Sequence, residues 1–232
     1  GDVSDGEWHH IAATFDRDGE VSLYIDGLLM ESTSMTHIGN INSGRPLTFG
    51  RDAENEYFFK GSMDEVKIWN AALTTQQVRE TMHITANLAT PNLIAYYQFN
   101  DDIYSTVQNI KGSAHGSLTA GQKVASTIPI GGGFANTQTE NSGSISFTNT
   151  DLDINFTAQN SAEVVVSKIN LAPNTVPTGL QRVFNSQYWA IHRYGTGSFA
   201  GNITFKGAED LTEGDAQMPD EVLLYGRNFN SD

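Results

Sequence analysis

The chain of 232 residues contains no cysteine, which excludes disulfide cross-links and cysteine-ligated zinc. Catalysis by a cysteine thiolate is excluded for the same reason. The sequence also lacks an apolar run long enough to span a bilayer, and no amino-terminal secretory signal is visible. Glycine is not a natural initiator, so we expect the sequence to be a fragment of a longer, secreted or cell-surface protein.

Positive charge is scarce, with 13 lysines and arginines against 27 aspartates and glutamates, and the net charge is −14. Such an acidic surface repels the phosphates of nucleic acids and of anionic membranes. We therefore expect neither nucleic acid nor an inserted membrane as a partner. Carboxylates in turns are, however, the ligands that Ca²⁺ prefers.

The sequence is instead rich in glycine, of which it has 22, and in short runs that alternate apolar and polar residues. Alternation over four to eight residues, interrupted by turn residues, is typical of half-buried strands. The composition predicts an all-β protein made of antiparallel β-sandwiches.

The clearest local pattern lies between residues 59 and 73. Residues 63–69 alternate and predict a strand, which leads directly into a short helix. Thr74 and Gln77 have the spacing of a capping box, and Leu73 and Val78 that of a hydrophobic staple.

Two earlier blocks, residues 8–27 and 47–51, precede this strand-and-helix block. We predict a hairpin and the beginning of a third strand in residues 1–30, and a short strand at 46–50. Glycines in Asp18-Gly19 and Asp26-Gly27 suit hairpin turns. Together the three blocks resemble the second half of a laminin G-like, or pentraxin-like, domain, a concanavalin-type jelly roll. The resemblance covers roughly residues 1–120 and implies that a strand at 93–99 closes the sandwich.

That family carries several strands before the block that begins at Trp8, whereas seven residues precede it here. Inner-face residues such as Ile11, Phe15 and Leu23 would then lack part of their cover. We expect an upstream segment of the same protein, or a partner chain, to complete this jelly roll.

Beyond residue 126 the pattern changes, and a triglycine at 131–133 indicates a turn. We predict two tandem sandwiches: a laminin G-like jelly roll lacking its N-terminal strands (1–126), and a smaller, immunoglobulin-like or jelly-roll sandwich that need not be complete (127–232). The strands expected in the second are 144–148, 152–156, 163–169, 188–194, 202–205 and 221–225. The block from Tyr188 resembles modules of type IX secreted proteins of gliding bacteria, although no terminal sorting domain is visible.

An acidic loop before the central strand supplies the metal-site prediction. The resemblance to pentraxin-like domains implies a Ca²⁺ site here, with Asp52, Glu54 and Asn55 as ligands and Asp64 as a further one. Hard cations need several oxygens at short range, which a loop can supply. The alternatives are a solvated acidic turn and, for Asp64, a hydrogen bond to nearby backbone.

Tyr57 ends the acidic loop, and there its ring could stack on a sugar, so it is the predicted ligand-binding residue. Most other aromatic residues alternate within strands and are more typical of a core.

We predict no catalytic residues. The sequence has no Gly-x-Ser-x-Gly elbow and no phosphate-binding glycine motif. Asp64 and Glu65 point to opposite faces of a strand, whereas a retaining glycosidase needs two carboxyl groups about 5 Å apart on one face. His9 and His10 also face opposite ways, and the other histidines stand alone, so a zinc site is not expected.

These features favour a non-catalytic binding or adhesion module of a larger secreted or cell-surface protein, which recognises a glycan or a protein. Two alternatives remain open. The chain could supply accessory domains to a secreted hydrolase whose catalytic domain lies elsewhere, or it could act as a structural spacer in a surface filament.

Overall fold

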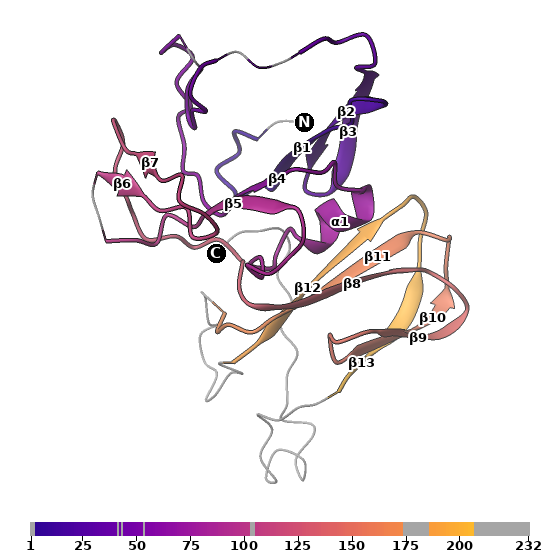
Figure 1. Ribbon diagram of the computed structural model, residues 1–232. Coiled ribbons are helices and arrows are strands. Elements are labelled where there is room, and N and C mark those ends of the chain that lie inside the picture. The colour runs from indigo at the N-terminus through magenta and orange to yellow at the C-terminus, as the bar shows by residue number, and fades with distance from the viewer. Residues whose placement is uncertain are drawn as a thin grey trace.

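The computed structural model describes residues 3–40, 42, 44–52, 54–102, 105–173 and 186–206. Within these ranges the chain forms antiparallel sheets and one short helix, which confirms the predicted all-β class (Figure 1). No helix in the described ranges is long and apolar enough to cross a membrane.

The first sheet has three strands in sequential order: β1 (Ile11–Phe15), β2 (Glu20–Ile25) and β3 (Leu28–Ser34). Asp26 and Gly27 join β2 to β3, both with positive φ (48° and 73°), as a two-residue hairpin of this type requires. The predicted hairpin and third strand are therefore confirmed.

The central block forms β4 (Val66–Trp69), followed by α1 (Thr75–Glu80). The Thr74 side chain accepts the N–H of Gln77 at 3.2 Å, and the Gln77 side chain accepts the N–H of Thr74 at 2.9 Å. The predicted capping box is thus present. β4 begins three residues later than expected, because Glu65 has a φ of 55°, which is incompatible with a strand.

β4 pairs with β5 (Leu93–Tyr97), and a short ribbon, β6 (Thr106–Val107) and β7 (Gly116–Ser117), lies beside them. A small core joins these parts, made of Ala95, Tyr97, Val107, Val66, Ile68, Phe99 and Leu118. The strand predicted at 46–50 is wrong: this segment is irregular. It lies where Phe49 packs edge-on against Tyr97 instead of joining a sheet.

The second half of the chain forms two three-stranded sheets, ordered β12-β11-β8 and β13-β10-β9. Their bounds are β8 (Gly133–Thr139), β9 (Gly143–Phe147), β10 (Leu152–Ala158), β11 (Glu163–Ile169), β12 (Tyr188–Tyr194) and β13 (Ala200–Phe205). The core between them contains Phe147, Leu152, Ile154, Phe156, Val164 and Val166, with Ile145, Trp189 and Phe205 packed against it.

Five of the six strands predicted in this half are confirmed, and the sixth, 221–225, lies outside the described residues. The structure adds β8, which begins at the last residue of the triglycine and was not predicted. There is no room for a side chain at Gly133, because a Cβ would lie 2.0 Å from the Lys168 carbonyl oxygen. The division of the chain at residue 126 stays a prediction.

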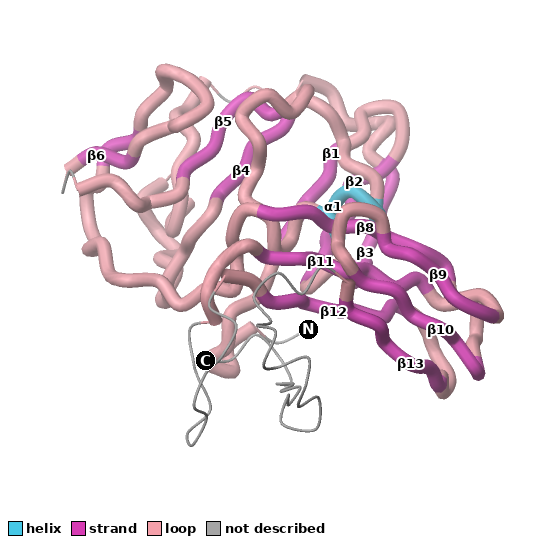
Figure 2. Tube along the Cα trace, turned by 90° about the horizontal axis from the view of Figure 1, so that it is seen from below, coloured by secondary structure: helices cyan, strands magenta, loops and turns pink. Residues whose placement is uncertain are grey.

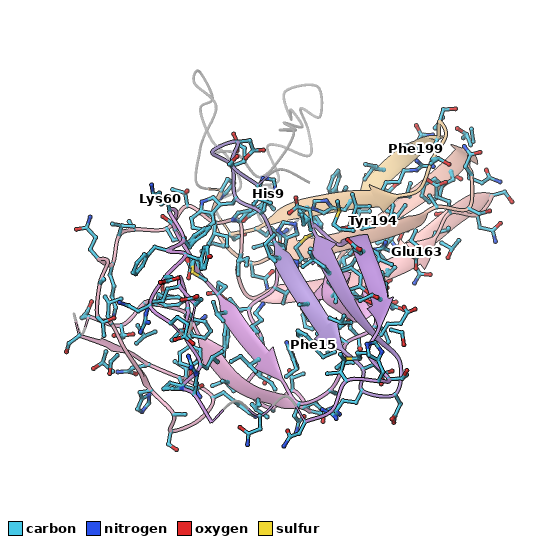
Figure 3. All side chains as sticks on the ribbon, turned by 90° about the horizontal axis from the view of Figure 1, so that it is seen from above. His9, Phe15, Lys60, Glu163, Tyr194 and Phe199 are labelled. Atoms are coloured by element: carbon cyan, nitrogen blue, oxygen red, sulfur yellow. The ribbon has the colours of Figure 1, made fainter. Side chains whose placement is uncertain are left out.

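A polar seam joins the first sheet to the second half of the chain, with α1 between them (Figures 1 and 2). Arg79 of α1 is buried and donates from Nε to the Gly27 carbonyl at 2.9 Å. Its guanidinium stacks on the Tyr194 ring, 3.8 Å from the centroid, and pairs with Glu163. Tyr194 donates its hydroxyl to the Asp26 carbonyl at 3.0 Å, and Figure 3 shows Tyr194 and Glu163 beside the first sheet.

We predict that Arg79→Ala lowers the free energy of unfolding by about 2–3 kcal/mol. The substitution leaves the buried Gly27 carbonyl without its hydrogen bond and removes the cation stacked on Tyr194. Urea denaturation of the 232-residue chain measures this. Arg45→Ala is the matched control: its exposed pair with Glu54 should change stability by less than about 1 kcal/mol. Equal effects of the two substitutions would show that the seam contributes no more than a surface ion pair.

Candidate functional site

The acidic loop is closed by the aspartate predicted as a metal ligand. Asp52 Oδ1 accepts the N–H of Glu56 at 2.7 Å and that of Glu54 at 3.1 Å. At the base of the loop, the N–H of Phe59 donates to the carbonyl of Gly50 at 2.8 Å. These bonds make the segment a self-contained loop whose shape depends on Asp52.

The other predicted calcium ligands point to different partners. Glu54 pairs with Arg45, Asn55 has a left-handed φ of 67°, and Asp64 Oδ1 accepts the N–H of Glu65 at 2.8 Å. No three or more acidic or histidine side chains of the described residues converge in a way that could hold a metal. These side chains are not gathered around one point in the described residues, and calcium stays a prediction based on the resemblance.

Beyond the acidic loop the chain exposes three consecutive aromatic residues, Tyr57–Phe59, which we call the aromatic loop. Tyr57 is 84% exposed, Phe58 58% and Phe59 54%. Tyr57 also has a positive φ of 49°, a conformation that costs free energy for a bulky side chain. The sequence indicated Tyr57, but it did not reveal that all three rings are exposed together.

An open groove lies between β1 and β4 and has a cavity volume of about 690 Å³. Every residue of both strands lines it, together with Phe59 of the aromatic loop, Met63 and residues 128–130. The sequence did not reveal this groove, because β1 and β4 are more than fifty residues apart and their proximity depends on tertiary packing.

A polar cluster lies along the β4 side of the groove. Glu65 accepts hydrogen bonds from the Tyr96 hydroxyl and, at 3.2 Å, from Gln98, and burial raises the pKa of its carboxyl. Lys67 donates to the carbonyls of Thr81 (3.0 Å) and Ile84 (2.7 Å), and burial lowers its pKa to about 8.

The hydrogen bonds of this cluster do not join two carboxyl groups. The hydrogen-bond partners of Glu65 are a phenol and an amide, and its acidic neighbour Asp64 is the adjacent residue in the chain. Acid–base hydrolysis of a glycoside needs a second carboxyl group across the cleft. The cluster instead holds the strained start of β4 in place, since each of its members bonds to a neighbouring element.

Histidines meet where the groove reaches the second half of the chain. His83 is buried, its Nδ1 lies 3.0 Å from the Pro129 carbonyl, and its Nε2 lies 2.8 Å from Nε2 of His192. Since a carbonyl only accepts, Nδ1 carries the proton of neutral His83, and His192 donates to its Nε2. Burial, reinforced by His192, lowers the pKa of His83 to about 4.

Comparison with known proteins finds a similarity to concanavalin-like domains in the first part of the chain. Residues 1–79 match a family described as the Concanavalin A-like lectin/glucanases superfamily. This supports the predicted laminin G-like resemblance for that part of the chain, while the family description itself includes both binding proteins and hydrolases.

Two curated relatives point to pentraxin domains. The chain is 33% identical over 116 residues to "Sushi, von Willebrand factor type A, EGF and pentraxin domain-containing protein 1" of Rattus norvegicus, covering 46% of this chain and 3% of that protein. It is 29% identical over 111 residues to neuronal pentraxin-2 of Cavia porcellus, covering 44% of this chain and 26% of that protein.

The chain thus spans only a small part of each of these relatives. No solved structure gives a significant match. The laminin G-like and pentraxin-like similarity of the N-terminal part is supported, and the relation to type IX secretion is not.

The calcium prediction can be tested by thermal unfolding. We assume a dissociation constant of about 10⁻⁴–10⁻³ M. If the site forms, Ca²⁺ at ten times this constant should raise the free energy of unfolding by about 1.4 kcal/mol and Tm by about 3–5 °C. Asp52→Ala should abolish that rise. Equal melting temperatures with and without 10 mM Ca²⁺, used here as roughly ten times the weaker constant, would remove the prediction.

Because two histidines are buried, we predict that the free energy of unfolding is lower in acid. Burial, with a smaller effect of Lys67, lowers the pKa of His10 to about 4, as burial does for His83, from an ordinary 6.5. The unfolded state therefore binds more protons between pH 6.5 and 4, and the free energy of unfolding falls through that window. His9, whose pKa is raised by Asp26, opposes this trend only in part.

Substituting one histidine measures its contribution to the pH dependence of the free energy of unfolding. His83→Gln should reduce the slope of stability against pH by up to one proton, about 1.4 kcal/mol per pH unit, between pH 4 and 6.5. Denaturant midpoints at several pH values measure the slope. The exposed His37→Gln serves as the control and should leave it unchanged; identical slopes for all three proteins would refute the assignment.

Proposed function

We propose that the chain is a non-catalytic binding module of a larger, extracellular protein and that it contacts its ligand through the aromatic loop. The observation that carries this proposal is the simultaneous exposure of three consecutive rings on a loop closed at its base. Exposed apolar patches of this kind typically mark interaction sites, and solvent-facing rings otherwise carry a cost.

The ligand fits one of two classes, a glycan or a protein surface. Flat aromatic rings present the large, rigid area that sugar rings and apolar protein surfaces both require. The net charge of −14 disfavours strongly acidic ligands, so a neutral glycan or a basic protein surface is the better match.

The accessory and spacer alternatives predict different behaviour. An accessory module of a hydrolase would still bind a polymer but would be joined to a catalytic domain, whereas a spacer would bind no ligand. Secretion by a type IX pathway is a separate proposal that rests on the Tyr188 block alone; growth-medium fractionation of the native host tests it.

The binding proposal predicts that Tyr57→Ala weakens ligand affinity about tenfold or more, equivalent to at least 1.4 kcal/mol. A glycan array and a panel of extracellular proteins identify the ligand for the 232-residue chain, and titration calorimetry then measures each variant. Phe58→Ala should show a similar loss.

Phe134→Ala is the matched control, since Phe134 is also 54% exposed but lies on β8. It should bind as the unsubstituted chain does. Unchanged affinity in Tyr57→Ala and Phe58→Ala would show that the aromatic loop is not the binding site. Failure to bind any ligand on the glycan array or in the protein panel would favour the spacer alternative.

A further inference from the structure

Two Asn-x-Thr triplets occur in the sequence, at residues 155–157 (Asn-Phe-Thr) and 202–204 (Asn-Ile-Thr). No other asparagine of the 232 residues is followed two positions later by serine or threonine. In secreted proteins an asparagine in such a triplet, with any residue except proline in the middle, is an acceptor of N-linked glycans. Because such triplets also occur by chance, the position of each one in the fold decides whether it can carry a glycan.

Both triplets lie on strands of one sheet, with the acceptors on its outer face. The 155–157 triplet belongs to β10 and the 202–204 triplet to β13, and these two strands pair. Since side chains alternate along a strand, the asparagine and the threonine of each triplet share one face. Phe156, in the middle of the β10 triplet, is buried in the core between the sheets, so Asn155 and Thr157 lie on the outer face.

The two asparagines lie opposite each other. Asn155 pairs with Asn202 in the β10–β13 ladder, before the ladder becomes irregular beyond Phe156. At the end of this ladder the N–H of Lys206 donates to the Asp151 carbonyl at 2.6 Å. Because bonded positions alternate along an antiparallel ladder, Asn155 and Asn202 are also a hydrogen-bonded pair, with Cα atoms about 5.5 Å apart. Their side chains therefore lie side by side on the outer face.

The side chains that carry the acceptor chemistry are exposed: Asn155, Thr157, Asn202 and Thr204. In the described part of the chain none of these side chains has a hydrogen-bond partner. On the other side of β10, Asn155 pairs with Ser144 of β9, which is small and exposed as well. These neighbours leave room for a sugar, and the sheet lies at the end of the molecule opposite β6 and β7 (Figures 1 and 2).

Other asparagines of the same half have local partners. Asn136 Oδ1 accepts the N–H of Thr148 at 3.2 Å, and Asn141 Oδ1 accepts the N–H of Ser142 at 2.9 Å. Bonds of this kind fix turns and neighbouring segments. The two triplet asparagines make no such bond in the described residues, so their amide groups have no structural role that a glycan would disturb.

We propose that Asn155 and Asn202 are N-glycosylation sites, modified in the secretory route while the chain is still unfolded, since both lie within paired strands of the folded protein. The side-chain nitrogen attacks C1 of the first sugar of a lipid-pyrophosphate-linked oligosaccharide. The N–C1 bond forms as the C1–O bond to pyrophosphate breaks, a base of the transferase takes a proton from the nitrogen, and the lipid pyrophosphate leaves. This inference rests on the extracellular location in the proposed function, and the aromatic loop takes no part in it.

Glycans at these positions shield the outer strand of the sheet. In the described part of the chain β13 pairs with β10 alone, so its other edge is open. Open edges invite pairing with other chains, and proteins block them in several ways. Two hydrated, bulky glycans on β13 and its neighbour oppose such pairing at this end of the molecule.

Glycopeptide mass spectrometry of the protein from the medium of its native host tests the proposal. Digestion by peptide N-glycosidase in heavy-oxygen water converts a glycosylated asparagine to labelled aspartate, so Asn155 and Asn202 should both carry the label. Asn141 is the internal control: it is exposed, but Gly143 stands two positions later, so it should stay unlabelled. An unlabelled Asn155 or Asn202 would refute that site, and two unlabelled residues would overturn the proposal.

Variants of the 232-residue chain, secreted from cultured animal cells, test the triplets themselves. Gel mobility before and after glycosidase treatment counts the glycans, and the unsubstituted chain should carry two. Asn155→Gln and Thr157→Ala should each lose one, whereas Thr157→Ser, which keeps the hydroxyl, should retain it. Asn202→Gln should lose the other. A secreted chain without glycans, or two glycans in every variant, would contradict the assignment.

Ligand binding separates this proposal from the proposed function. Enzymatic removal of the glycans from the folded chain should leave affinity for the ligand unchanged, since the aromatic loop, Tyr57–Phe59, lies in the other half of the chain. Absent glycans with intact binding would refute the modification alone. Glycans at both sites of a chain that binds no ligand would support the modification and refute the binding function.

Discussion

The packing of the Arg79 guanidinium between two halves of the chain is the interaction on which the arrangement depends. It bonds the turn at Gly27, stacks on Tyr194 and pairs with Glu163, so one side chain links α1 to the first sheet and to the second half. Gly27 is required at this point, since a Cβ would meet the Tyr194 hydroxyl at 2.4 Å. A buried cation is stable only when its donors are satisfied, which gives this seam its specificity.

The rest of the first half contains apolar side chains that no other element covers in the described part of the chain. The first sheet packs one face toward the seam, where Tyr24 is buried, and leaves Ile11 and Phe15 in the groove and Leu23 exposed. The aromatic loop borders the same groove but is shaped independently, by the bonds to Asp52 and by the closure at Gly50. Exposed apolar surface thus has two distinct origins here: one face of a three-stranded sheet and a locally closed loop.

The acidic loop shows why residue type alone does not determine which carboxylates lie together. Asp52, Glu54 and Asp64 have the oxygens that calcium prefers, but each carboxylate has a nearer partner in a backbone amide or an arginine. Short-range hydrogen bonds within a turn compete directly with a cation for the same lone pairs. Tyr57 is different, because its ring is exposed at the end of a closed loop, and its role in ligand binding stays a prediction.

The sequence alone determined the local structure: alternation marked most strands, the Asp26-Gly27 pair marked a hairpin, and the capping box at Thr74 placed the start of α1. These features depend on neighbours within a few positions, which the sequence displays directly. Only the tertiary structure brought β1 beside β4, joined His83 to His192 and put Arg79 between distant strands. Those contacts connect residues from about 50 to more than 100 positions apart, and their formation depends on the burial of whole faces, to which no local pattern in the chain corresponds.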